Sequence, residues 1–335
     1  MKRIQVSDPH LSGYQSDIIN SQSGLTQRLH NIMGSLSFAA EYGRTNNIKY
    51  IDIDGDLIND KDVIYTDAQN AFAKFLLKYS DINFTLLTGN HDLSSTGEFQ
   101  SSACSVFSDY KNVRVVNEVL VDGDITYLPF SNHIGKDLKN LKGNKILISH
   151  FGLSEGMLQS GLSVISEVKI SDLKKFKMVI LGHYHKPQKI SGNGVDVYYC
   201  GSVCHHSWND KNEQKRFLVI DTDTLEVQSI DFTGFTEYKE YIIDTPENAV
   251  NIMIEAEKAK NFGHHVRVRK MFQEEIKNES NLVLIEEKKD IDITNRGLDL
   301  TQSDTEIHKK YLSIKEIPEN EHDEYIKVLQ KVGVL

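Results

Sequence analysis

The stretch NFTLLTGNHD at residues 83–92 joins a β-prone run to a turn that carries an amide, an imidazole and a carboxylate. A parallel strand delivers the residues that follow it to the edge of the sheet where ligands bind. Upstream, the residue patterns run strand, helix, strand, helix and strand, which predicts parallel strands joined by crossover helices. The expected elements are strands at 2–7, 48–54 and 83–88 and helices at 25–42 and 68–79.

Four more short motifs follow predicted strands in the same way. They are DPH at 8–10, GD at 55–56, SH at 149–150 and GHYH at 182–185. Taken singly each motif is weak, because a lone histidine at a strand end is more often a satisfied surface or core residue. Together, and in this order, the five motifs bring carboxylates, an amide and several imidazoles to one place. That is a ligand set for two divalent cations side by side, a device that cleaves phosphate esters.

The candidate metal ligands offer carboxylate and amide oxygens and imidazole nitrogens, which suit Mn²⁺, Fe²⁺ or Zn²⁺ better than Ca²⁺. Asp56 follows Gly55, where the backbone can turn sharply, and is our candidate for a carboxylate that bridges both metals. No thiol is needed, which argues against a structural zinc site. The predicted set is Asp8, His10, Asp56, Asn90, His150, His183 and His185.

The remaining patterns predict further short strands and three segments after the main domain. Strands are expected at 113–116, 119–121, 125–128, 145–149, 178–181, 195–200, 216–221 and 227–232, enough for a second sheet packed on the first. We predict a main domain at 1–233 and a small α/β domain at 234–287, with strands at 241–244, 265–269 and 282–285 and helices at 247–259 and 271–277. A linker at 288–304 and an amphipathic helical tail at 305–335 complete the expected order.

Composition narrows the class of protein. The 335 residues, 39% hydrophobic and 26% charged, are typical of a globular chain. No run approaches the roughly 18–20 apolar residues of a membrane helix. Three cysteines without a disulfide framework, and an N-terminus that soon becomes polar, favour a cytoplasmic protein that does not bind membranes. With a net charge of −10, a polyanionic substrate must be held by a local basic patch, by the metals or by a partner.

The five motifs resemble the pattern D-x-H, G-D, G-N-H-[DE], H and G-H-x-H of the calcineurin-like metallophosphoesterases, over residues 1–233. The resemblance implies an α/β fold with a two-sheet sandwich flanked by helices. It implies that one metal is held by Asp8, His10, Asp56 and His185, and the other by Asp56, Asn90, His150 and His183. His91 resembles the family's non-ligand histidine that faces the leaving oxygen, with Asp92 as its orienting partner. Both are therefore our candidate catalytic residues.

Downstream segments resemble the SbcD-type DNA repair and recombination nucleases, with a compact size most similar to phage-encoded members. The segment VYYCGS at 197–202 is similar to the stretch after G-H-x-H in that branch. The small α/β domain resembles a capping domain that contacts DNA, so Arg267, Arg269 and Lys270 are candidate DNA contacts, with a solvated strand face as the alternative.

The same resemblance implies manganese, exonuclease and endonuclease activity, and partners. The tail at 305–335 resembles the part that docks on the coiled coil of an SMC-like ATPase. Members of the branch pair as homodimers, for which residues 25–40 and 95–107 are candidate contacts. If the chain is phage-encoded, its expected place is the host cytoplasm.

Two other functions stay open. A phosphodiesterase of the same family that acts on nucleotides or other small molecules explains the metal motifs equally well and the acidic charge better. It gives no reason for the segments beyond Phe232. A non-catalytic scaffold that keeps the fold is the second alternative, and the presence of every ligand position and His91 argues against it.

Overall fold

The structure, a computed structural model, describes residues 1–13, 18–94, 101–158, 166–271 and 283–286, together with Lys309, Pro318, His322, Asp323 and Ile326. The chain divides into two compact units. The first comprises Met1–Glu240 and Ala259–His265, and the second comprises Tyr241–Lys258 and Val266–Leu335. The boundaries expected near residues 233, 287 and 304 stay predictions, and the linker at 288–304 lies outside the described residues.

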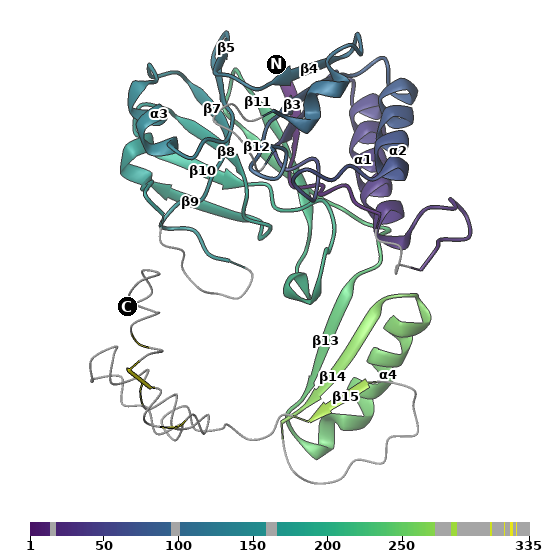
Figure 1. The fold of residues 1–335 in the computed structure, drawn as a ribbon. Coiled ribbons are helices and arrows are strands. Elements are labelled where there is room, and N and C mark those ends of the chain that lie inside the picture. The colour runs from purple at the N-terminus through teal and green to yellow at the C-terminus, as the bar shows by residue number, and fades with distance from the viewer. Residues whose placement is uncertain are drawn as a thin grey trace. The chain divides into compact units, whose positions relative to one another are not determined.

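Two six-stranded sheets form the first unit (Figure 1). The first sheet has the order β12 (Val227–Asp231), β11 (Arg216–Asp221), β1 (Lys2–Val6), β2 (Tyr50–Asp54), β3 (Asn83–Leu87) and β4 (Val113–Val116). The second has the order β5 (Leu120–Asp122), β6 (Ile125–Leu128), β7 (Ile146–His150), β8 (Met178–Gly182), β10 (Val195–Tyr199) and β9 (Gln188–Gly192). Strands β1 to β4 are parallel, as are β6, β7, β8 and β10. The predicted two-sheet sandwich is confirmed.

Alternation along the strands builds three apolar layers. In β7, Ile146 and Ile148 pack in the core between the sheets, whereas Leu147 packs on the outer face of the second sheet. In β1, Ile4 and Val6 face the helices that cover the first sheet. Side chains two residues apart on a strand share a face, so the alternation of apolar positions specifies both layers at once.

Two helices cover the first sheet where the sequence predicts them, and one further helix, which was not predicted, covers the second sheet. Helix α1 (Gln27–Thr45) begins after Thr26, whose side chain accepts a hydrogen bond from the Leu29 N–H, and α2 (Thr66–Lys78) lies beside it against the first sheet (Figure 1). Helix α3 (Ile134–Asn140) contributes Ile134 and Leu138 to the outer core of the second sheet. Single 3-10 turns occur at Ala103–Phe107, Ile170–Leu173, Trp208–Asp210 and Pro246–Asn248. None of the helices in the described residues has an apolar stretch long enough to span a bilayer.

The residues after Phe232 include a three-stranded sheet and a helix. The sheet has the order β13 (Tyr238–Ile243), β14 (His265–Lys270) and β15 (Val283–Glu286), and α4 spans Ala249–Asn261. Apolar side chains of the second unit gather between helix and sheet, namely Ile243, Ala249, Ala256 and Val268. The helix expected at 271–277 lies outside the described residues apart from Met271, and the tail at 305–335 apart from five single residues.

One strand was not predicted from the sequence. Strand β9 has the sequence QKISG and lies at the edge of the second sheet, where no position of the strand is fully buried. An edge strand that faces solvent on one side need not carry the apolar pattern by which strands are found.

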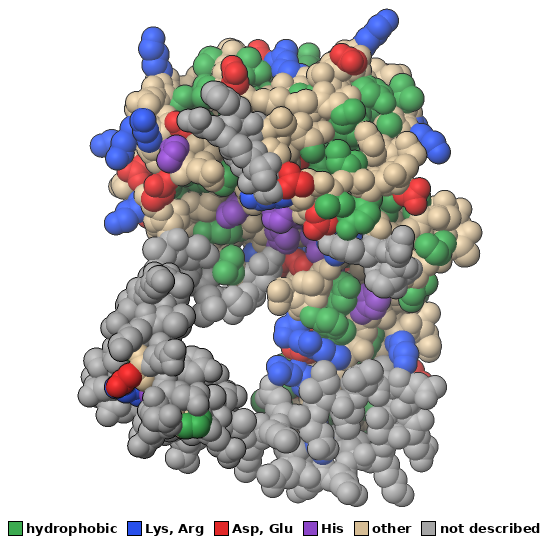
Figure 2. Space-filling view, in the orientation of Figure 1, with side chains coloured by type: hydrophobic (Ala, Val, Ile, Leu, Met, Phe, Trp, Pro, Cys, Tyr) green, Lys and Arg blue, Asp and Glu red, His purple; other side chains and the backbone are tan. Residues whose placement is uncertain are grey.

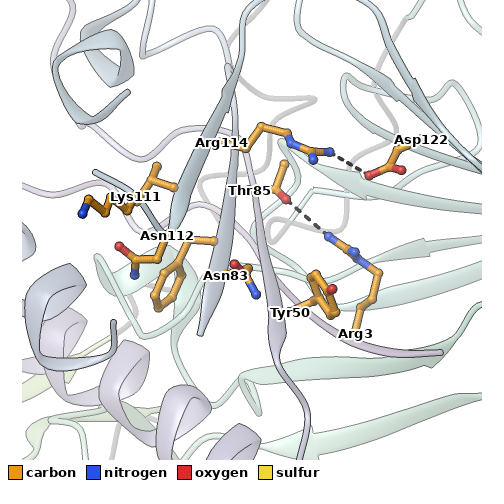
Figure 3. A pocket seen from close by; sticks show the side chains of 10 residues that line it. Arg3, Tyr50, Asn83, Thr85, Lys111, Asn112, Arg114 and Asp122 are labelled. Carbon is orange, nitrogen blue, oxygen red and sulfur yellow. Dashed lines mark hydrogen bonds and ion pairs between the residues drawn. The ribbon is translucent and has the colours of Figure 1, made fainter. Parts of the chain in front are cut away.

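The amino ends of β1 to β4 line a hollow of about 280 Å³, which we call the amino-edge hollow (Figure 3). Both arginines in its lining are paired within the protein. Arg3 Nε lies 2.8 Å from Asp52 Oδ2, and the guanidinium sits over the Tyr50 ring at 4.8 Å. Arg114 forms an ion pair with Asp122 at 2.7 Å.

Candidate metal centre

The five predicted motifs meet at the carboxyl ends of the central strands. Asp8 and His10 follow β1, Asp56 follows β2 and Asn90 follows β3, three neighbouring strands of the first sheet. In the second sheet His150 ends β7, and His183 and His185 follow directly on β8. Strand β2 packs against β7 and β8, so the ends of both sheets converge at one place.

The predicted aspartate and histidine ligands form two groups that adjoin at Asp56, and a third group, of His10, Asp56 and His91, overlaps both. Atoms of Asp8, His10 and His185 lie within 4.8 Å of one another, as do atoms of Asp56, His150 and His183. Asp56 Oδ2 lies 3.7 Å from His10 Nε2 and 3.2 Å from His150 Nε2. One carboxylate oxygen therefore faces both groups, which is the position of a bridging ligand.

Asn90 belongs to the second group. Its Oδ1 lies 3.2 Å from His150 Nε2 and 3.0 Å from His183 Nδ1. His150 Nδ1 donates to the backbone carbonyl of Asp54 at 2.8 Å, which fixes the tautomer and leaves Nε2 directed toward Asn90 and Asp56. The structure thus brings all seven predicted ligands together.

The backbone at these positions is held in a conformation that L-residues rarely adopt. The φ angles are +52° at Asp8, +50° at His10, +52° at Asp56 and +95° at His183. Residues other than glycine in this region are uncommon and cluster at functional sites. Gly55 also has a positive φ, and a Cβ there would collide with the His150 ring. Glycine at position 55 is therefore required by the packing of the centre.

Burial and opposite charges divide the histidines into two kinds. Burial lowers the pKa of His10 well below its usual value and, with His150 nearby, lowers the pKa of His183 to about 4. Burial also works against a charged His150, but Asp56 outweighs it and raises the pKa of His150 to about 10. Although burial would raise the pKa of Asp56, the His150 charge holds that pKa below its usual range. His10 and His183 therefore present lone pairs at neutral pH, and His150 carries the proton that a cation would displace.

The donor set fits divalent cations. His10 Nε2 and His185 Nε2 lie 3.0 Å apart, and His10 Nδ1 is buried without a hydrogen-bond partner among the described residues. Two imidazole nitrogens this close can serve as ligands of one cation. Carboxylate, amide and imidazole donors without thiolate suit Mn²⁺, Fe²⁺ or Zn²⁺. Asp8, His10, Asp56 and His185 would hold one ion, and Asp56, Asn90, His150 and His183 the other.

His91 lies at the centre, but its partner differs from the expected one. Its ring meets the His10 ring edge-on at 4.8 Å, and its backbone N–H donates to Asp56 Oδ1 at 2.9 Å. The ring Nδ1 lies 2.5 Å from the Asn59 carbonyl oxygen, which can only accept, so Nδ1 carries the proton. The expectation that Asp92 orients His91 is wrong for this structure, because the Asp92 carboxylate accepts from the N–H groups of Ile58 and Gly89.

Asp92 instead fixes the loops that carry His91. Its two oxygens accept at 2.9 Å and 2.8 Å, which ties the turn after β2 to the turn after β3. Burial, reinforced by Asp56, raises the pKa of Asp92 to about 7. A carboxyl that is fully buried behind the turn supports the site without reaching a substrate.

Two residues that motif spacing did not identify support the ligands from behind. His206 is buried, and its Nε2 donates to the Asp8 carbonyl at 3.0 Å. Lys215 is fully buried, and its Nζ donates to the His185 carbonyl at 2.9 Å and to Asp210 Oδ1 at 2.7 Å. Asp210 Oδ2 in turn accepts from the His206 N–H. The one visible sign was the polar run HHSWND at 205–210, since nothing in a sequence marks a lysine as buried.

The predicted DNA contacts lie in β14 of the second unit. Arg267 and Arg269 are half-buried, whereas Lys270 is buried, with 2% of its surface exposed. The expectation for Lys270 is corrected accordingly, because its side chain does not reach the surface that DNA would touch. The roles of Arg267 and Arg269 stay predictions.

Histidine side chains, drawn in purple, gather on the face of the first unit seen in Figure 2. His183 and His185 are both partly exposed and line a hollow of about 240 Å³ with His206, Ser207, Asn209 and Asp210. The centre is therefore open to a ligand from solvent.

A model of the family described as calcineurin-like phosphoesterase matches residues 1–201, which is more than half of the chain. The chain belongs to the calcineurin-like phosphoesterase family. The predicted class, a metal-dependent hydrolase of phosphate esters, is thereby confirmed. All seven candidate ligands lie within the matched residues.

Relatives of this phosphoesterase include a component of a nuclease. The SbcD subunit of the SbcCD nuclease of Staphylococcus epidermidis is 24% identical over 138 residues, which cover 39% of this chain and 36% of that protein. The match thus spans about a third of that protein's length.

Among solved structures, a dimetal phosphatase from Danio rerio is 12% identical, covering 69% of this chain and 99% of that chain with a TM-score of 0.42. An archaeal phosphodiesterase is 14% identical, covering 69% and 100% with a TM-score of 0.37. At these identities and TM-scores the solved structures add nothing on substrate.

Proposed function

We propose that this phosphoesterase is a two-metal DNA nuclease subunit of the SbcD type, which hydrolyses phosphodiester bonds in repair or recombination. The observation that carries the proposal is the pair of ligand groups that share Asp56, with His91 beside them. Two cations held side by side suit in-line displacement at phosphorus. We further propose manganese as the native metal, since the donor set is one of oxygen and imidazole nitrogen.

Different residues of the chain have different roles in hydrolysis. When two divalent cations are bound, they supply Lewis acidity that activates water and offsets the charge developing on phosphate. The Asn59 carbonyl holds one proton of His91 on Nδ1, so Nε2 is the nitrogen left to exchange protons. After Nε2 takes up a second proton from solvent, the ring can pass that proton to the leaving oxygen and return to the neutral form. Asp56 accepts from the His91 N–H, so the same carboxylate that faces both ligand groups also holds the proton donor in place.

DNA as substrate is supported by the SbcD relative and by the residues beyond the family match. Arg267 and Arg269 in β14 are the proposed DNA contacts in that region. The acidic net charge leads us to propose that an SMC-like coiled-coil ATPase, docked on the segment at 305–335, supplies much of the grip on DNA. Pairing of two copies through residues 25–40 and 95–107 is part of the same proposal, and residues 95–100 lie outside the described residues.

The test is cleavage of linear duplex and single-stranded DNA by the purified chain with Mn²⁺, with Mg²⁺ and with EDTA. Asp56→Asn serves as the matched control, because it keeps the shape of the side chain and removes the shared charge. We expect Mn²⁺-dependent loss of DNA that falls by at least about a thousandfold in Asp56→Asn.

A second substrate, bis-p-nitrophenyl phosphate, separates the nuclease from a small-molecule phosphodiesterase. Hydrolysis of this diester by a preparation that leaves DNA intact, both alone and with the ATPase partner present, would contradict the nuclease proposal. Tight, salt-sensitive DNA binding by the chain alone would contradict the proposed need for a partner.

A further inference from the structure

A second hollow, of about 460 Å³, adjoins the metal centre within the first unit. It shares His206 with the hollow over His183 and His185, so one residue borders both. The volume lies in the range of sites that hold small organic ligands. We call it the side hollow; its lining includes His205, His206, Tyr238, His265, Arg28 and Asn31.

Three rings in the wall of the side hollow stand roughly parallel. The Tyr238 ring lies 4.5 Å from the His265 ring at an interplanar angle of 23°, and 6.4 Å from the His205 ring at 29°. His205 is buried at the inner end of this column, and His265 is exposed at the outer end. A column of aligned rings with an exposed end is a surface on which a further flat ring can stack.

The column is rigid at its inner end. His205 Nε2 donates to the Glu213 carbonyl at 2.7 Å, and Nδ1 accepts from the Tyr238 N–H at 2.9 Å. Both ring nitrogens are therefore engaged, so the ring cannot rotate without losing two hydrogen bonds. Trp208 meets Tyr238 edge-on at 5.1 Å and supports it from the side. A preformed stacking surface costs little conformational entropy when a ligand binds.

The polar groups of the side hollow suit a nucleotide. Arg28 Nη1 donates to the His206 carbonyl at 3.2 Å, which places a guanidinium next to the residue that borders both hollows. Gln27 Nε2 donates to Asn31 Oδ1 at 2.9 Å, so amide groups line the wall along α1. Aromatic rings beside a cation and amides form the combination that holds bases and phosphates of single strands.

We propose that the side hollow binds an unpaired nucleobase of the substrate, stacked against the His205–Tyr238–His265 column, while the adjacent phosphate lies at the metal centre. This assignment rests on the proposed function, since it takes the ligand to be a nucleic acid. If the base binds there, the strand next to the scissile bond must be single-stranded. Recognition of the base would not depend on sequence, because every base has a face that can stack.

Trp208, the one tryptophan of the chain, is a built-in reporter of the column. The experiment titrates the full chain in EDTA with an eight-nucleotide oligothymidylate and with an abasic strand of equal length, at one salt concentration. Binding is read from Trp208 fluorescence and from the polarisation of end-labelled strands. We expect the oligothymidylate to bind about five- to a hundredfold more tightly than the abasic strand, the range that stacking one base gives.

His265→Ala should remove most of that preference and leave abasic binding unchanged. His133→Ala is the matched control, because His133 is an exposed histidine elsewhere in the first unit, before α3. Equal binding of the two strands by the wild type, or a preference that survives in His265→Ala, would overturn the assignment.

Failure of the side-hollow proposal and failure of the nuclease proposal would give different results. DNA cleavage without any base-dependent binding would overturn the side hollow alone. Base-dependent binding by a chain that cleaves no DNA, either alone or with the ATPase partner present, would keep the side hollow and overturn the nuclease.

Discussion

The central parallel strands and their neighbours carry charged and polar groups at both ends, yet the two ends are organised in opposite ways. At the amino ends, Arg3 pairs with Asp52, and Arg114 pairs with Asp122 as Figure 3 shows, so the charges of both arginines are matched within the protein. At the carboxyl ends, imidazoles face one another, His10 Nδ1 has no partner in the described part of the chain, and four ligands have positive φ angles. Both ends are hollowed, so a cavity alone does not mark a site. What marks it is convergent donors that the protein leaves unmatched, held on a strained backbone.

The largest expected effect tests whether the residues at the carboxyl ends of the strands catalyse hydrolysis. His91→Ala should lower turnover by about 10²- to 10⁴-fold, the contribution of a positioned proton donor, while all seven predicted ligands stay in place. Metal affinity, measured by titration calorimetry, should stay within about twofold of the wild type. Full turnover in this variant would remove His91 from the mechanism.

Substitutions at the amino ends of the strands should instead lower the free energy of unfolding. Arg3→Met leaves Asp52 buried without its cation and should cost about 3–5 kcal/mol of unfolding free energy, as loss of one partner of a buried pair does. Chemical denaturation measures it, with Arg114→Met as the control, since that half-exposed pair should contribute about 0–1 kcal/mol. Metal affinity of folded Arg3→Met should be unchanged, and a loss of metal binding there would contradict the division between the ends.

A smaller effect concerns the support behind the ligands. Lys215→Met removes the donor to the His185 carbonyl and the partner of Asp210, so metal affinity should fall by about 10- to 100-fold, as when groups that orient metal ligands are lost. Lys145→Met is the matched control, because Lys145 Nζ also donates to two carbonyls, those of Thr222 and Asp223, away from the centre. Equal losses of metal affinity in the two variants would show that Lys215 acts through general stability alone.

The smallest expected effect tests which histidine of the metal centre carries a proton before a cation binds. With the pKa of His150 raised to about 10, the metal-free protein carries a proton there at pH 7.5 that a cation must displace. His183, with its pKa lowered to about 4, is already neutral and releases none. Metal affinity should therefore rise with pH by about tenfold per unit between roughly pH 7 and 10, where one proton is released. Calorimetry in two buffers of different ionisation enthalpy counts that proton, and a count of zero would contradict the His150–Asp56 pairing.

The ligands of the metal centre could be predicted from the sequence because they lie at the ends of strands. Buried parallel strands are recognisable by their apolar, β-branched runs, and the residue after each strand goes to one edge of the sheet. Asp8, Asp56, Asn90 and His150 could be placed together on that ground alone. The partner of His91 could not, because the Asn59 carbonyl is a backbone group and carries no mark in the sequence.

The remaining misses have similar causes. Strand β9 lacks an apolar stripe because it lies at an edge. Lys215 and Lys270 look like surface residues in the sequence, and only packing shows that both are buried. The ring column at Tyr238 joins residues 205, 238 and 265, which no short motif connects.

The central claim is that Asp56 joins two cations into one centre, and low-temperature electron paramagnetic resonance of the Mn²⁺-loaded chain tests it most directly. Metal-free protein would be titrated to two equivalents of Mn²⁺, with Asp56→Asn beside it. The account predicts uptake of two ions per chain and the multiline signal of an exchange-coupled pair, which Asp56→Asn loses. Uptake of a single ion, or the six-line signal of isolated Mn²⁺ at full loading, would contradict it.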